Sequence, residues 1–265
     1  MIKVGFVGVG NMGSALARAV AKTGIADILL YDKNEALAKT LAEELNAAAV
    51  SLTALAGEAE IVFLGVKPNI IPTACRELDS VFTSNDAVIV SMAAGVDVAS
   101  ISSCFSGEHP IIRIMPNTPV SVGEGMILWC ANKKGEARFC DLENIMQSAG
   151  TLDKISEGLI DAASAIAGCG PAFAFMFIEA LADGGVKSGL PRDKAMLYAE
   201  KMLKGAAVLA DMSDKHPAAL KDAVCSPGGS TIAGVCALED GAFRSAVISA
   251  VESSYKRTLE LGKNN

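Results

Sequence analysis

The chain has 265 residues, a length that fits one large domain or two domains of ordinary size. Hydrophobic residues make up 51% of it and charged residues only 20%, which excludes an intrinsically disordered chain and predicts a sizeable core. Its 23 basic and 30 acidic residues give a net charge of -7, so the basic surface of a nucleic-acid-binding protein is not expected.

The seven cysteines are odd in number and include no Cys-x-x-Cys pair. This pattern is typical of free thiols and argues against both a disulfide framework and a thiolate metal site. We expect buried thiols in a reducing compartment. The first residues enter a strand-like pattern directly, without the basic and apolar regions of a secretory signal, so the sequence predicts a cytoplasmic protein.

One uncharged stretch raises the alternative of a membrane span. Residues 162–178 form 17 positions without a formal charge, interrupted by the Gly-Cys-Gly-Pro sequence at 168–171. A bilayer needs about 20 apolar residues, and the basic and aromatic flanks of a span are missing. We therefore expect a helix that is buried between two subunits and no membrane association.

The first 155 or so residues alternate short apolar runs with amphipathic segments, which predicts a parallel sheet covered by helices. One such helix is expected over 34–45, where leucines recur every four residues. Eight strands are expected, near Lys3–Val9, Asp27–Tyr31, Ala47–Val50, Ile61–Val66, Ala87–Ser91, Pro110–Ile114, Met126–Ala131 and Thr151–Ile155.

The strand pattern stops at about Leu159, and the remaining residues form helix-length segments separated by glycine and proline turns. The sequence thus predicts a dinucleotide-binding domain at residues 1–158 and an all-helical domain at residues 159–265. Because no flexible linker separates them, we expect the domains to join along a continuous helix. The cleft between two domains is the default place for a ligand.

A phosphate-binding loop is predicted between the first strand and the first helix. The strand Val4–Val7 leads into a Gly-x-Gly-x-x-Gly motif, and an alanine-rich helix follows it. In a dinucleotide-binding fold, the first glycine permits a tight turn, the second admits the diphosphate to the helix N-terminus, and the third lets helix and strand pack closely. The motif consists of Gly8, Val9, Gly10, Asn11, Met12 and Gly13.

Asp32 follows the second expected strand, 19 positions after Gly13. An acidic side chain at this place usually accepts hydrogen bonds from the adenosine ribose, which favours NADH. Lys33 comes next and could attract a 2'-phosphate, so the sequence leaves NADPH or NADH open. The other interpretation of Asp32 is a cap on the turn before Asn34.

A second anion-binding loop is expected near the C-terminus. A Ser-Pro-Gly-Gly-Ser-Thr sequence precedes a helical run that begins near Ile232. Unpaired amides and the positive end of the helix dipole converge at such a place, which suits a substrate carboxylate, although a plain capping turn has the same composition. The candidate residues are Ser226, Gly228, Gly229, Ser230 and Thr231.

These motifs together resemble the pyrroline-5-carboxylate reductase family over nearly the whole chain. The Gly-rich loop at 8–13 is general among dinucleotide-binding proteins, whereas the segment Leu220–Gly234 is close to diagnostic. Other matching stretches are Val66-Lys67-Pro68, Ala93-Ala94-Gly95-Val96, Met115–Pro119, Gly168–Ala172, Gly189–Arg192 and Leu238–Gly241.

The resemblance implies an enzyme that reduces the cyclic imine 1-pyrroline-5-carboxylate to L-proline with NADPH or NADH, with a Rossmann-type domain and a helical domain that joins two subunits. Rings of dimers are also known in the family. By position, residues 226–231 hold the substrate carboxylate and the Thr231 hydroxyl bonds the ring nitrogen as the catalytic side chain. The segments implied to line the cofactor are Val66-Lys67-Pro68 and Ala93-Ala94-Gly95.

Two other functions are less consistent with the sequence. A hydroxyacid dehydrogenase of similar architecture places a lysine shortly after the glycine pair of the interdomain helix, and residues 171–177 contain no lysine. A dinucleotide-binding scaffold has no use for an intact anion loop at 226–231. His109 and His216, the only histidines, precede prolines in expected loops and are not expected to be catalytic.

Overall fold

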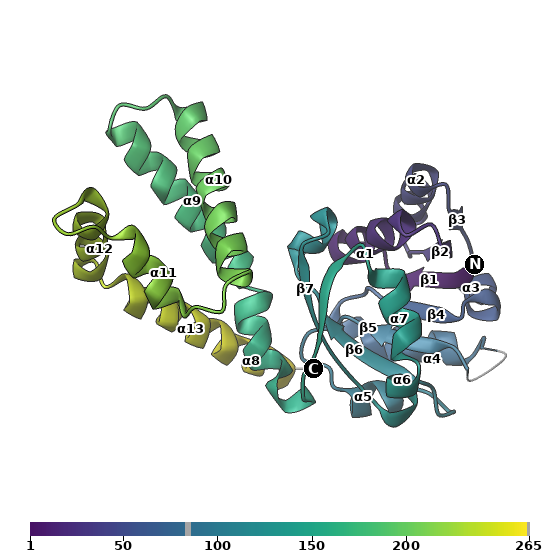
Figure 1. The fold of residues 1–265 in the computed structure, drawn as a ribbon. Helices are drawn as coiled ribbons and strands as arrows, with labels where there is room; N and C mark the ends of the chain where they lie inside the picture. The colour runs from purple at the N-terminus through teal and green to yellow at the C-terminus, as the bar shows by residue number, and fades with distance from the viewer. Residues whose placement is uncertain (83–85, 264–265) are drawn as a thin grey trace. The chain divides into compact units, whose positions relative to one another are not determined.

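The computed structural model describes residues 1–82 and 86–263, which form two compact units (Figure 1). The first unit contains Met1–Cys169 together with the C-terminal segment from Ser254 onward, and the second contains Gly170–Ser253. The predicted boundary after residue 158 stays a prediction. That boundary falls within the helix Glu157–Ala167, which packs on the sheet, so the first unit extends to Cys169.

The first unit is built on one eight-stranded sheet in the order β3-β2-β1-β4-β5-β6-β7-β8. All neighbouring strands are parallel except β6 and β7, as the predicted mostly parallel sheet requires. The strands are β1 (Ile2–Val7), β2 (Ala26–Tyr31), β3 (Ala48–Ala49), β4 (Ile61–Leu64), β5 (Val88–Ser91), β6 (Ile111–Met115), β7 (Gly125–Ala131) and β8 (Gly150–Lys154).

Helices cover both faces of this sheet (Figure 1). One core contains residues of α1 (Asn11–Lys22), α2 (Glu35–Leu45) and α7 (Phe139–Met146). The opposite core contains residues of α3 (Leu52–Glu58), α4 (Ile71–Asp79), α5 (Val98–Ser102) and α8 (Glu157–Ala167). The short α6 (Lys133–Ala137) and the 3-10 helices η1 (Pro68–Ile70) and η2 (Thr118–Val122) complete the unit.

Strands β4 and β5 are buried along their whole length and apolar except for Ser91, because helices cover them on both sides. The stacked rings of Phe6 and Phe63, with centroids 4.7 Å apart, join β1 to β4 within one core. The strands predicted from continuous apolar runs are therefore confirmed, and the helix predicted over 34–45 is α2.

Three glycines let the backbone cross closely at the end of β1. A Cβ on Gly13 would lie 2.3 Å from the carbonyl oxygen of Gly8, and a Cβ on Gly65 would lie 2.4 Å from the same atom. Gly8 also has a φ of 94°, which L side chains rarely adopt. The start of α1 can pack against the ends of β1 and β4 only because all three positions lack side chains.

A buried arginine fastens α8 to the sheet. Arg113, on β6, is 2% exposed, and its Nη2 atom lies 2.9 Å from Oδ1 of Asp161 on α8. Its Nη1 atom lies 3.5 Å from Oε1 of Glu157, which also accepts a 2.7 Å hydrogen bond from the amide of Val98. These contacts explain why α8, which spans the predicted boundary, belongs to the sheet unit.

The second unit consists of helices. They are α9 (Gly170–Lys187), α10 (Arg192–Asp211), α11 (Pro217–Val224), α12 (Ser230–Asp240) and α13 (Phe243–Lys263), whose last turns belong to the first unit. Helices α9 and α10 pack side by side around the small residues Ala182, Ala195 and Ala199 (Figure 1). Such small side chains bury little apolar area.

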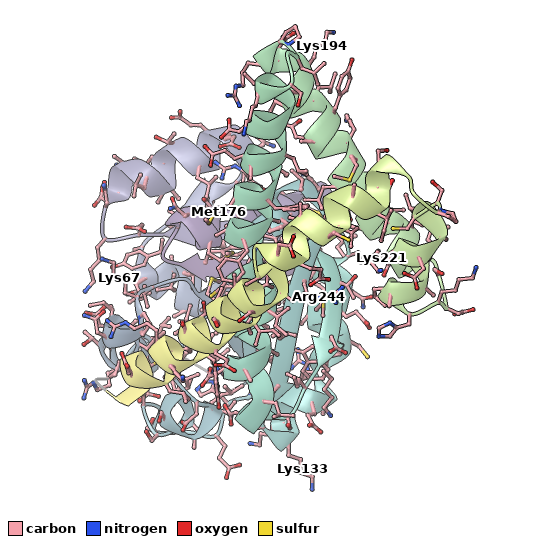
Figure 2. The ribbon with its side chains drawn as sticks, turned by 90° about the vertical axis from the view of Figure 1, so that its left-hand side faces the viewer. Lys67, Lys133, Met176, Lys194, Lys221 and Arg244 are labelled. Atoms are coloured by element: carbon pink, nitrogen blue, oxygen red, sulfur yellow. The ribbon has the colours of Figure 1, made fainter. Side chains whose placement is uncertain are left out.

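Large apolar side chains remain exposed on the second unit. Met176, labelled on α9 in Figure 2, is 68% exposed. It borders an apolar groove of about 410 Å³ that includes Phe173 and Phe177 of α9, Leu238 of α12 and Val247 of α13. By length and composition, the stretch Glu157–Lys187 could also cross a membrane, a property that it shares with core helices of soluble proteins.

All seven cysteines are free thiols. The expectation that they are buried is correct for Cys75 and Cys130 and wrong for Cys140 and Cys236, which are exposed. Burial raises the pKa of Cys75 to about 12 and that of Cys130 to about 11. Both buried thiols are therefore protonated and unreactive at neutral pH.

His109 is buried against the rings of Phe82 and Phe105. Its Nδ1 atom lies 3.4 Å from the carbonyl oxygen of Ala87, and its Nε2 atom has no partner among the described residues. Burial lowers the pKa of His109 because it disfavours the charged imidazolium. The expectation that this histidine is structural agrees with its surroundings.

We expect Gly13→Ala to lower the free energy of unfolding by about 1–3 kcal/mol, the usual cost of forcing a methyl group into packed surroundings. Chemical denaturation at one fixed protein concentration measures it. Gly57→Ala is the matched control, because Gly57 lies within α3 and a Cβ there meets nothing within 4 Å. Equal stability of the two variants would contradict the close crossing.

We also expect His109 to contribute to the decrease in the free energy of unfolding at acidic pH. In the unfolded chain the His109 imidazole binds a proton at a pKa of about 6.5, whereas in the folded chain it does so only at lower pH. The free energy of unfolding therefore has its full value above about pH 6.5 and declines below it. His109→Phe should reduce that decline, measured by urea unfolding from pH 7 to 5. His216→Asn, at an exposed helix cap, is the control. If the free energy of unfolding declined equally with pH in His109→Phe and wild type, the decline could not be assigned to His109.

Candidate active site

The loops that follow four parallel strands meet at one edge of the sheet. Strand β1 lies between β2 and β4, and β5 is the next neighbour of β4, all in parallel register. The carboxyl ends of these strands carry the segments 8–13, 32–33, 66–68 and 93–95. In open α/β sheets, ligands bind at this edge, where the chain reverses its direction across the sheet.

A pocket of about 300 Å³ opens beside the phosphate-binding loop. Gly10 is the N-cap of α1, without a side-chain cap, and a Cβ at this position would meet nothing within 4 Å. The first amides of α1 thus lack intrahelical partners and are accessible to an anion. The lining residues are Val7, Gly8, Gly10, Tyr31, Asp32, Lys33, Gly65, Val66, Lys67, Ile70, Ala74 and Glu77.

Asp32 is held at the end of β2 by two backbone amides. Its Oδ2 atom accepts a 2.9 Å hydrogen bond from the amide of Val9, and its Oδ1 atom accepts a 2.8 Å bond from the amide of Asn34. The second bond is the turn cap that the sequence left as the other interpretation. The first joins Asp32 to the phosphate-binding loop. A carboxylate has about four acceptor sites, so two remain for a ligand.

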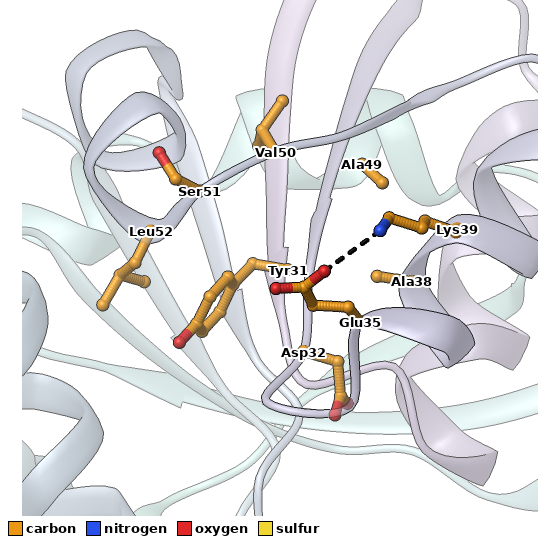
Figure 3. A pocket seen from close by; sticks show the side chains of 9 residues that line it. All are labelled: Tyr31, Asp32, Glu35, Ala38, Lys39, Ala49, Val50, Ser51 and Leu52. Atoms are coloured by element: carbon orange, nitrogen blue, oxygen red, sulfur yellow. Dashed lines mark hydrogen bonds and ion pairs between the residues drawn. The ribbon is translucent and has the colours of Figure 1, made fainter.

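The side chain of Lys33, in the turn after β2, is directed to a carboxylate on α4. Its Nζ atom lies 3.3 Å from Oε1 of Glu77 on α4, and both residues line the pocket. On the opposite side of Asp32, a hollow of about 460 Å³ is bordered by Tyr31 and α2. There the ammonium of Lys39 is directed to the Glu35 carboxylate at 3.0 Å (Figure 3).

The other predicted cofactor residues occupy the same edge without lining this pocket. Asn11 and Met12 are in the first turn of α1, and Pro68 begins η1. Gly13 is buried beneath Gly8, where it packs the helix on the strand. The segment Ala93-Ala94-Gly95 directly follows β5.

Several lining residues were missed by sequence reasoning. Gly65 and Tyr31 flank predicted residues in the chain, and the end of a predicted strand is the signal that could have found them. Glu77 left no such signal, because its contact with Lys33 joins residues 44 positions apart. Only the packing of α4 beside β4 brings the two together.

In the helical unit, the predicted substrate loop lies between α11 and α12. Gly228 has a φ of 66°, which favours glycine, and Gly229 is an extended N-cap of α12 without a side-chain cap. Ser230 and Thr231 are the first residues of this 11-residue helix, and the Thr231 side chain is exposed. The first turn contains no acidic residue, so the positive end of the helix is not neutralised locally.

His216 caps α11, where its Nδ1 atom accepts a 3.2 Å hydrogen bond from the amide of Ala218. His109 is in the core of the sheet unit, as described above. Neither imidazole lines the pocket beside the phosphate-binding loop. The lining of this pocket thus contains carboxylates, lysines and a tyrosine but no imidazole.

Two family models match the chain. Residues 157–261 match the dimerisation domain of pyrroline-5-carboxylate reductase, and residues 3–95 match a domain described as NADP oxidoreductase, coenzyme F420-dependent. The first match begins beside the predicted domain boundary. The second covers the phosphate-binding loop and the edge of the sheet described above.

Among curated relatives, pyrroline-5-carboxylate reductase 3 of Danio rerio is 38% identical, over 98% of this chain and 92% of the relative. The pyrroline-5-carboxylate reductase of Synechocystis sp. is 39% identical over 99% of each chain.

Solved structures agree with these relatives. The Plasmodium falciparum pyrroline carboxylate reductase with NADP bound is 32% identical with a TM-score of 0.86, and the Streptococcus pyogenes 1-pyrroline-5-carboxylate reductase is 31% identical with a TM-score of 0.88. Each match covers 98% of both chains. The identities and the nearly complete coverage show that the chain belongs to the pyrroline-5-carboxylate reductase family.

Proposed function

We propose that the chain reduces the C=N bond of 1-pyrroline-5-carboxylate to give L-proline, the last step of proline biosynthesis, with NADPH or NADH as reductant. The observation that carries this proposal is the uncapped start of α12 behind the Ser226–Thr231 loop, an anion site in the segment that is most specific to the family. The close packing of Gly8, Gly13 and Gly65 and the pocket beside them support a second site, for the dinucleotide that supplies the hydride.

The residues at the sheet edge fit a dinucleotide. A reduced nicotinamide supplies a hydride when it is bound. Gly8, Gly10 and Gly13 allow the diphosphate to approach the first amides of α1, since a side chain at Gly10 would stand in that space. We propose that Asp32 accepts hydrogen bonds from the adenosine ribose, and the acceptor sites left on its carboxylate support this role.

The segments after β4 and β5 complete the proposed cofactor site. Val66 and Lys67 line the pocket together with Lys33, and Pro68 begins the short helix that follows. Ala93, Ala94 and Gly95 are on the next strand end of the same edge. We assign them to the walls of the cofactor site, where their small side chains leave room.

The loop before α12 is proposed to hold the substrate. Ser226, Gly228, Gly229 and Ser230 offer backbone amides and hydroxyls to the carboxylate, which the positive end of the helix also attracts. Thr231 is proposed to hydrogen-bond the ring nitrogen and to orient it. A protonated cyclic imine is already electrophilic at carbon, so alignment matters more for hydride transfer than a general base does.

We propose that self-association covers exposed apolar side chains of the helical unit. The small alanine core leaves Met176, Val247 and other large apolar side chains exposed, and large exposed apolar patches are typical of protein–protein interaction sites. We propose a homodimer formed through this unit, with a ring of dimers as a further assembly. Seven free thiols support a cytosolic location, because disulfides are rare there.

An absorbance assay at the reduced nicotinamide band tests the reaction. Purified protein with pyrroline-5-carboxylate and either NADPH or NADH should oxidise the reductant and form proline, which amino-acid analysis detects. A matched reaction with a hydroxyacid substrate in the oxidative direction should show no turnover. Failure to oxidise either reductant would leave only a binding function.

We expect Thr231→Ala to lower turnover about 10- to 100-fold, since one lost hydrogen bond to a charged group costs roughly 1.5–3 kcal/mol. Thr231→Ser keeps the hydroxyl and should recover most of the activity. Steady-state kinetics at saturating cofactor measure both variants. Wild-type turnover in Thr231→Ala would remove this residue from the mechanism.

We expect a dimer or larger assembly at micromolar concentration and its dissociation in Met176→Asp, which places a charge beside the apolar groove. Sedimentation velocity measures the assembly, and circular dichroism verifies that the helices are retained. Lys133→Glu, at the start of α6 in the sheet unit, is the surface-charge control. A wild-type monomer would contradict the proposed assembly.

A further inference from the structure

We propose that this chain selects NADH over NADPH, and that Glu77 is a selectivity residue that acts together with Asp32. The inference rests on the proposed function, because it concerns the cofactor of that reaction. It is carried by the hydrogen bonds that fix Asp32 and by the ion pairs that occupy the lysines nearest to it in the chain.

The position of the Asp32 carboxylate is set by the backbone. Amides from two different loops, at Val9 and Asn34, donate to its two oxygens at 2.9 Å and 2.8 Å. The side chain therefore cannot turn away without losing both bonds. Ribose hydroxyls can use its remaining acceptor sites, whereas a 2'-phosphate would place nearly two further negative charges beside a fixed carboxylate.

A site for a 2'-phosphate needs a cation to balance this charge. Lys33 follows Asp32 directly, but its ammonium is 3.3 Å from the Glu77 carboxylate. Lys39 borders the hollow on the other side of Asp32, and its ammonium pairs with Glu35 at 3.0 Å. Both lysines are thus engaged by carboxylates.

Lys67 is the third lysine at this edge. It lines the same pocket but follows β4, which is separated from β2 by β1. The part of the pocket beside β2 therefore combines the Asp32 carboxylate with a lysine whose charge Glu77 balances.

Glu77 contributes in two ways. It holds the Lys33 ammonium toward α4, and it adds a second carboxylate to the lining of the pocket. Replacing it with glutamine keeps the size of the side chain and removes the charge, so that Lys33 becomes available to a 2'-phosphate. The expected effect is modest, about two- to fivefold, because the pair is exposed and screened by solvent.

The experiment measures dissociation constants of NADH and NADPH from the increase in nicotinamide fluorescence, without substrate, and of 5'-ADP and 2',5'-ADP by competition. Wild type should bind NADH more tightly than NADPH. Asp32→Ser should shift the ratio of the NADH and NADPH dissociation constants by about tenfold in favour of NADPH, since serine can still cap the turn and carries no charge. Glu77→Gln should shift it about two- to fivefold in the same direction.

A double variant tests whether Glu77 acts through Lys33. Adding Lys33→Gln to Glu77→Gln should cancel the gain for NADPH, whereas a general effect of charge at Glu77 would survive. Glu108→Gln is the matched control, because it breaks an exposed 3.0 Å Lys–Glu pair with Lys134 and does not line this pocket. It should leave the ratio unchanged.

The outcomes separate the two proposals. Wild-type binding that is equal for both cofactors, or tighter for NADPH, overturns the selectivity and leaves the reductase function intact. An unchanged ratio in Glu77→Gln overturns the role of Glu77. If neither dinucleotide nor either ADP binds, the proposed function itself fails.

Discussion

The carbonyl oxygen of Gly8 is the point on which the arrangement of the sheet unit depends. It lies so close to the Cα atoms of Gly13 and Gly65 that a methyl group on either would overlap it. Because this contact joins the end of β1 to α1 and to the end of β4, it determines where the first amides of α1 lie relative to the sheet edge. A bulkier residue at either position would move the helix away from the strand and with it the anion-binding amides.

Asp32 extends this constraint to the neighbouring strand. Its carboxylate accepts one hydrogen bond from the loop after β1 and one from the turn after β2, so a single side chain fixes both loops. A carboxylate held by two backbone hydrogen bonds cannot easily change its orientation to suit a ligand. In the proposed cofactor site the ligand must instead match the carboxylate, and under this proposal the turn cap also determines the choice of cofactor.

The two units are stabilised in different ways. The sheet unit has two continuous apolar cores, one on each face, and Arg113 fastens α8 to it. The helical unit has a core of small alanines and exposes large apolar side chains on α9 and α13. Its stability is therefore expected to depend on subunit association, which makes the apparent stability of the whole chain depend on protein concentration.

The sequence by itself determined the alternating architecture, the eight strands, the phosphate-binding loop and the loop before α12, because local periodicity and glycine spacing are properties of short segments. It left open whether Asp32 caps a turn or faces a ribose, and the folded chain shows a carboxylate that caps the turn and still has acceptor sites free. It could not reveal Glu77 beside Lys33, the buried pairing of Arg113, or which cysteines are exposed. These features depend on residues that are distant in the chain and adjacent only after the helices pack on the sheet, and no local pattern records such packing.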